Sequence, residues 1–119
     1  MFKKEEIDSL IKYLLKMNKR YSGESIKLTE YCKTKMRERG IEEQVVIDTI
    51  TLSNSLYYAE KQEIPFKEKK EIRYKEVYKI SSKYSLIIII AYEEKILKVI
   101  NVIKTSKGAE KLWRKKVLG

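Results

Sequence analysis

Histidine is absent from the 119 residues, and cysteine and proline occur once each. Without histidine there is no imidazole to serve as a general base or metal ligand, and Cys32 alone excludes an internal disulfide and a multi-cysteine zinc site. We therefore expect no metal and no cofactor.

The longest apolar run, Leu86 to Ala91, is far shorter than the roughly 20 residues that span a bilayer, and acids at Glu5 and Glu6 argue against a signal peptide. A cytoplasmic protein without a membrane segment is predicted.

Charge is abundant and strongly biased. Lys and Arg number 27 against 17 Asp and Glu, which gives a formal net charge of +10. Such a balance favours RNA or another polyanion, or an acidic protein, as the partner. The abundance of Lys, Glu, Ile and Tyr also resembles proteins of thermophiles, so part of the lysine excess can reflect habitat.

Three helices are predicted before the first long strand. Apolar residues at i, i+3, i+4, i+7 and i+8 indicate an amphipathic helix over residues 3–18. After a short extended segment, 25–28, Thr29 is a suitable N-cap and Gly40 a suitable helix end for the second helix. Glu42 and Glu43 open the third. The first helix carries its apolar stripe at Ile7, Leu10, Ile11, Leu14 and Leu15.

The second half of the chain has the period of strands. Residues 56–59 read as extended, and the charged stretch 60–70 with Pro65 reads as a mobile loop. Strands follow over residues 72–80, 84–92 and 96–103, joined by short turns, and Ser106 begins a last helix. The continuous apolar strand Tyr84 to Tyr92 is expected at the centre of the sheet, covered on both faces.

These elements predict an α+β fold. Short connections between the last strands favour antiparallel pairing, in a sheet of about four strands with helices packed on one face. The chain is long enough for one domain with a real core, and we take residues 1–119 as that domain.

The predicted sheet carries the first candidate site. Arg73, Lys75 and Lys79 share one face of a strand, and alternate residues of a strand are about 7 Å apart, a spacing that suits the phosphates of a single strand. Tyrosines beside them could stack bases, with Tyr74 and Tyr78 expected in the core and Tyr84 and Tyr92 exposed at strand ends. An ordinary solvated sheet face explains the same pattern. Further cations of this candidate are Lys83, Lys98 and Lys104.

The last helix and the single cysteine are the other candidates. The helix is basic and could contact phosphates or an acidic partner, although a solvated amphipathic helix looks the same. Cys32 lies at the inward spacing of its helix, which indicates an inert buried thiol. The helix carries Lys107, Lys111, Arg114, Lys115 and Lys116.

Two stretches resemble a known superfamily. Residues 28–32 and 35–41, with Arg39-Gly40-Ile41 at the turn, resemble the opening of small domains related to the RelE and BrnT toxins. The strands from Glu71 to Lys104 and the helix after them resemble the meander of that group. The resemblance covers residues 25–117 and leaves residues 1–20 as an added N-terminal helix. Tyr31 stands where those domains usually carry a histidine.

The resemblance implies a RelE-like fold, an acidic antitoxin as partner, and metal-independent cleavage of RNA by attack of the 2′-hydroxyl. Cations would stabilise charge on the phosphoryl oxygens, and a tyrosinate, a lysine of lowered pKa, Glu76 or Glu93 would accept the proton. A non-catalytic nucleic-acid-binding protein and a protein-interaction module are the alternatives. The cleavage role would fall to Arg73, Lys79, Tyr92 and Lys98; binding would fall to Lys75, Lys83, Tyr84, Lys104, Lys111, Arg114 and Lys115.

Overall fold

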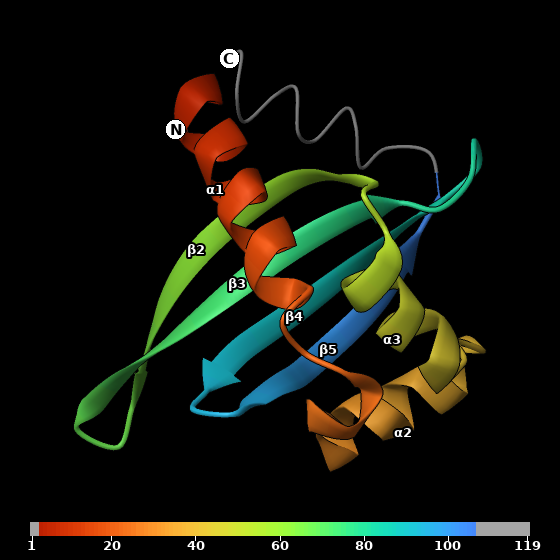
Figure 1. Ribbon diagram of the computed structural model, residues 1–119. Coiled ribbons are helices and arrows are strands. Elements are labelled where there is room, and N and C mark those ends of the chain that lie inside the picture. Colours follow the sequence, from red (N-terminus) through yellow and green to blue (C-terminus); the bar gives the residue numbers. More distant parts are fainter. Residues whose placement is uncertain (1–2, 107–119) are drawn as a thin grey trace.

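The computed structural model describes residues 3–106, which form three α-helices and five β-strands (Figure 1). The predicted α+β class is confirmed. The helix predicted to begin at Ser106 lies outside the described residues, as do its Lys111, Arg114 and Lys115. In chain order the elements are α1 (Lys4–Asn18), a 3-10 turn (Gly23–Ser25), β1 (Ile26–Leu28), α2 (Glu30–Arg39), α3 (Glu43–Leu52), β2 (Leu56–Phe66), β3 (Lys69–Lys79), β4 (Ser85–Glu93) and β5 (Ile96–Thr105).

The strands form one mixed sheet in the order β1-β5-β4-β3-β2. The predicted sheet of about four antiparallel strands is wrong in two respects, because there are five strands and β1 pairs parallel with β5. Hairpins force β2 to β5 to be antiparallel, whereas two helices and three strands separate β1 from β5, so no turn fixes their direction. The apolar strand β4 is the middle strand, as predicted.

The helix ends follow local capping chemistry. Thr29 accepts a hydrogen bond from the Cys32 backbone N–H at 3.0 Å and so satisfies a donor of the first turn of α2. Gly40 ends that helix with φ of 67°, a left-handed conformation that glycine adopts without strain. Both predicted boundaries are confirmed.

The predicted loop over residues 60–70 is a hairpin instead. β2 and β3 pair from Leu56–Tyr78 to Phe66–Lys69, and Lys67 and Glu68 form a two-residue turn with φ of 45° and 61°. Such a turn is of type I′, which matches the twist of the flanking strands. Pro65 is tolerated because β2 is an edge strand.

Glycine at position 68 should stabilise this hairpin. Glu68→Gly relieves a left-handed conformation that costs an L-residue about 1–2 kcal/mol, partly offset by the greater entropy of glycine in the unfolded chain. We expect the free energy of unfolding, measured with urea, to rise by about 0.5–1 kcal/mol. Lys69→Gly, at the first residue of β3, should lower it; stabilisation by both changes would contradict the turn assignment.

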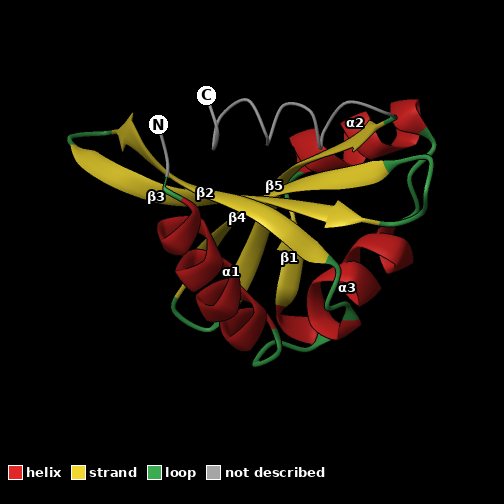
Figure 2. Ribbon diagram, turned by 90° about the horizontal axis from the view of Figure 1, so that it is seen from above, coloured by secondary structure: helices red, strands yellow, loops and turns green. Residues whose placement is uncertain are grey.

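The main core lies between the sheet and the helices. α1 and α3 lie against the same face of the sheet, and α2 lies beside β5 (Figure 2). Completely buried side chains from both layers meet there, so the strand and helix stripes read from the sequence form one apolar layer. No helix within residues 3–106 is long and apolar enough to cross a membrane. Core residues with no more than 1% exposure include Leu14, Met36, Ile50, Ile88, Ile90, Leu97 and Val99.

Candidate nucleic-acid interface

The predicted catalytic cations Arg73 and Lys98 lie together, but carboxylates hold them. Glu71 is 3.2 Å from the Arg73 guanidinium and 3.2 Å from the Lys98 ammonium, and Glu93 is 2.6 Å from Lys98. Although partial burial opposes its ionisation, hydrogen bonds from Arg73 and Lys98 hold the pKa of Glu71 below its usual value. Hydrogen bonding to Glu93 is the main reason that the pKa of Lys98 is raised. The two positive charges are therefore largely neutralised locally.

The other two predicted catalytic residues lie elsewhere. Lys79 is exposed at the end of β3, six residues and about 20 Å along the strand from Arg73. Tyr92 faces the helices on the opposite side of the sheet, where its hydroxyl donates to Asn18 Oδ1 at 2.5 Å. The structure therefore does not bring Arg73, Lys79, Tyr92 and Lys98 to one point.

A buried polar network surrounds Tyr92. Asn18 Nδ2 donates to Glu76 Oε2 at 2.7 Å and to the Tyr78 hydroxyl at 3.0 Å, and that hydroxyl donates to Glu76 Oε1 at 3.0 Å. Glu76 is completely buried, which raises its pKa to about 8 despite the two donors. Burial likewise raises the pKa values of Tyr78 and Tyr92, most strongly through desolvation and then through Glu76.

Two of the proton acceptors considered from the sequence, Glu76 and Tyr92, lie on the face of the sheet opposite the cations. Glu76 has no exposed surface, and burial raises the pKa of Tyr92 and so disfavours a tyrosinate further. Glu93 does lie beside the cations, where it forms an ion pair with Lys98. Tyr78 is also completely buried, so its predicted core position is confirmed. Cys32 is buried too, and desolvation raises its pKa to about 11, so it is an uncharged thiol.

The predicted binding residues Tyr84 and Lys104 do come together. The Lys104 ammonium lies over the Tyr84 ring, 4.4 Å from its centroid, in a cation–π contact between the start of β4 and the end of β5. Lys83 is exposed in the turn that precedes Tyr84. Lys75 lies apart from them, half-buried on β3 between Glu60 of β2 and Ile89 of β4.

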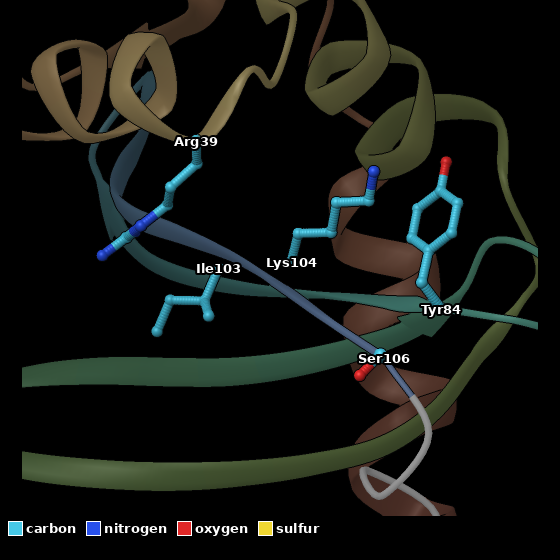
Figure 3. A pocket seen from close by; sticks show the side chains of 5 residues that line it. All are labelled: Arg39, Tyr84, Ile103, Lys104 and Ser106. Carbon is cyan, nitrogen blue, oxygen red and sulfur yellow. The ribbon is translucent and has the colours of Figure 1, made fainter.

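Tyr84 and Lys104 line a pocket together with Arg39. The pocket has a volume of about 440 Å³, and its remaining lining residues are Ile103 and Ser106. In Figure 3, Lys104 lies between Arg39, at the end of α2, and Tyr84. Because β1 covers β5 only as far as Val99, no strand of the described chain pairs with the outer edge of β5 at the pocket.

Arg39 is held in place from one side. Its Nη1 donates to the Val102 carbonyl at 2.6 Å and to Asn101 Oδ1 at 3.0 Å, which ties the end of α2 to β5. The sequence does not assign Arg39 to a site, because its position in a helix does not indicate the strand that it meets. Only the Arg39-Gly40 turn of the family resemblance marked it.

The charges of this pocket differ from those of the sheet face. Among the ion pairs within residues 3–106, none includes Arg39 or Lys104, although both are exposed. Two cations beside an aromatic ring, with no carboxylate paired to them in the described part of the chain, can hold an anion and stack a flat group. Residues 3–106 contain no cluster of three or more acidic, cysteine or histidine side chains that could hold a metal ion.

Comparison with known proteins adds no relative. The chain matches none of the protein-family models, curated proteins or solved structures with which it was compared. The resemblance to RelE and BrnT toxins therefore stays a prediction from the sequence. The function proposed below rests on the geometry and charge of the site itself.

Proposed function

We propose that this protein binds RNA without cleaving it, and that the pocket of Arg39, Tyr84 and Lys104 is the centre of the interface. The observation that carries the proposal is the pairing of a tyrosine ring with two cations that have no carboxylate partner within residues 3–106, in a chain of net charge +10. We refer to these three residues as the basic pocket.

The chemistry of the basic pocket suits a nucleotide. The Arg39 nitrogens that do not contact β5 can donate to two oxygens of one phosphate, while Lys104 acts as a mobile point charge. The Tyr84 ring can stack a base of any identity, which gives affinity without sequence preference. A volume of about 440 Å³ lies in the range of small-molecule sites.

Cleavage of RNA has less support than binding. Attack by a 2′-hydroxyl needs a proton acceptor and cations at the same phosphate. The four residues to which the toxin resemblance assigns these roles lie on two faces of the sheet, and Arg73 and Lys98 already hold carboxylates. We therefore favour the non-catalytic function over a toxin-type endoribonuclease.

Binding of a fluorescent single-stranded RNA at several salt concentrations tests the proposal. Arg39→Ala and Lys104→Ala should each weaken binding about five- to tenfold and lower the salt slope by about one, because each removes about one phosphate contact. Lys12→Ala, which removes an exposed cation of α1, is the matched control and should change little.

The same assay can contradict each part of the proposal. Equal losses in Lys12→Ala and the pocket variants would mean that binding is unspecific, and tighter binding to DNA of the same sequence would contradict the choice of RNA. Cleavage of the RNA by the natural protein, lost in Arg73→Ala, would instead support the toxin-type endoribonuclease. No binding at low salt by a folded protein would rule out the function and leave an acidic protein as the partner.

A further inference from the structure

An aromatic and cationic stripe runs along α2 towards the basic pocket. Tyr31, Lys35 and Arg39 follow one another at intervals of four residues, so they lie along one flank of the helix. The Lys35 ammonium is 5.8 Å from the centroid of the Tyr31 ring. From Tyr31 to Arg39 the helix rises about 12 Å.

Tyr31 is unusual among the exposed apolar side chains of the described residues. Its exposed fraction is 56%, and it makes no ring contact with another aromatic residue among residues 3–106. Tyr13, also exposed, packs instead against Tyr74 with ring centroids 6.3 Å apart. The other exposed large side chains are aliphatic and cannot stack a base; they are Val45, Leu52, Ile72 and Ile96.

The stripe repeats the chemistry of the basic pocket. At one end Lys104 covers Tyr84, at the other Lys35 lies beside Tyr31, and Arg39 lies between the two pairs. Lys35 is also 3.3 Å from Glu38, but this pair lies at the surface, where such an ion pair contributes little and exchanges readily. Two stacking rings separated by cations are the pattern of surfaces that follow a single strand.

We propose that single-stranded RNA runs from the basic pocket along α2, with one base stacked on Tyr84 and a later base on Tyr31. Arg39, Lys104 and Lys35 hold the phosphates between them. This inference rests on the proposed function and specifies its ligand. The bases must be unpaired to reach the rings, and the strand must be about four nucleotides or longer, at the lower end of known single-strand sites.

We call the path from Tyr84 to Tyr31 along α2 the track. The length of the oligonucleotide distinguishes binding along this track from binding at the basic pocket alone. We would measure binding of oligouridylates of 3 and 12 nucleotides to the full chain and to Tyr31→Ala and Tyr84→Ala. Loss of a stacked base weakens binding about fivefold or more. Tyr84→Ala should weaken both ligands, whereas Tyr31→Ala should weaken only the 12-mer. Tyr31→Phe keeps the ring and should restore binding; Tyr31 is exposed, so neither change should disturb the fold.

Each outcome has one consequence. If Tyr31→Ala binds the 12-mer like the natural protein while Tyr84→Ala is weakened, the track is wrong and the proposed function stands. If the 12-mer paired with its complement binds as tightly as the free strand, the track is also wrong. If neither length binds at low salt, the proposed function fails together with it.

Discussion

Replacing Glu76 by glutamine should remove most of the pH dependence of stability between pH 5 and pH 9. Glu76 is completely buried, and its pKa is raised from 4.5 to about 8 because burial disfavours the charged form. Its hydrogen-bond donors, Asn18 and Tyr78, only partly compensate, and no cation is bound to it among the ion pairs of the described residues.

The direction of this pH dependence follows from the protons that the folded and the unfolded states bind. Below pH 4.5 the carboxyl of Glu76 is protonated in both states and does not lower the free energy of unfolding. Between pH 4.5 and pH 8 the unfolded chain has lost this proton while the folded protein keeps it, so the free energy of unfolding falls as the pH rises. From pH 5 to pH 9 the loss attributable to Glu76 is about 4 kcal/mol.

Urea unfolding of the natural protein and of Glu76→Gln at pH 5, 7 and 9 measures this difference. The natural protein should be least stable at pH 9, and the variant should lose much less stability over the same range. Glu24→Gln is the control, because the Glu24 side chain is exposed in the 3-10 turn and the pH slope should remain. Parallel slopes for the natural protein and Glu76→Gln would show that the buried carboxyl does not titrate in this range.

Local patterns in the sequence predicted most of the elements but not the hairpin of β2 and β3, and not every pairing. Apolar spacing and caps predicted α1 to α3, and the apolar run predicted the central strand β4. The hairpin at Lys67 and Glu68 was missed because these residues are not the Asn-Gly pair that usually marks a type I′ turn. The parallel pairing of Ile26 with Leu97 joins residues far apart in the chain, and no local pattern reports it.

The candidate site was predicted in part for a similar reason. Strand parity placed Arg73, Lys75 and Lys79 on the sheet. Position at a strand end indicated Tyr84, and charge on a following strand indicated Lys104, but neither showed that the two touch. Strand parity does not predict that Glu71 of β3 reaches Lys98 of β5 across β4, because such contacts depend on the register of the strands. Arg39 was missed because it belongs to a helix whose end meets β5 only in the folded chain.

The buried network makes Asn18 the polar residue whose loss should cost most. Its side chain supplies a donor to Glu76 and to Tyr78 and an acceptor to the Tyr92 hydroxyl, and it is completely buried. Asn18→Ala leaves Glu76 Oε2 and the Tyr92 hydroxyl without their Asn18 partner in the interior, while Tyr78 keeps its hydrogen bond to Glu76, so we expect the free energy of unfolding to fall by about 3 kcal/mol. The loss should be greater at pH 9, where Glu76 is ionised, than at pH 6.

Asn54→Ala, at an exposed position where the amide only meets Lys19, should cost less than about 0.5 kcal/mol. Equal losses in the two variants, or an Asn18→Ala loss independent of pH, would mean that α1 is held to the sheet by its apolar stripe alone.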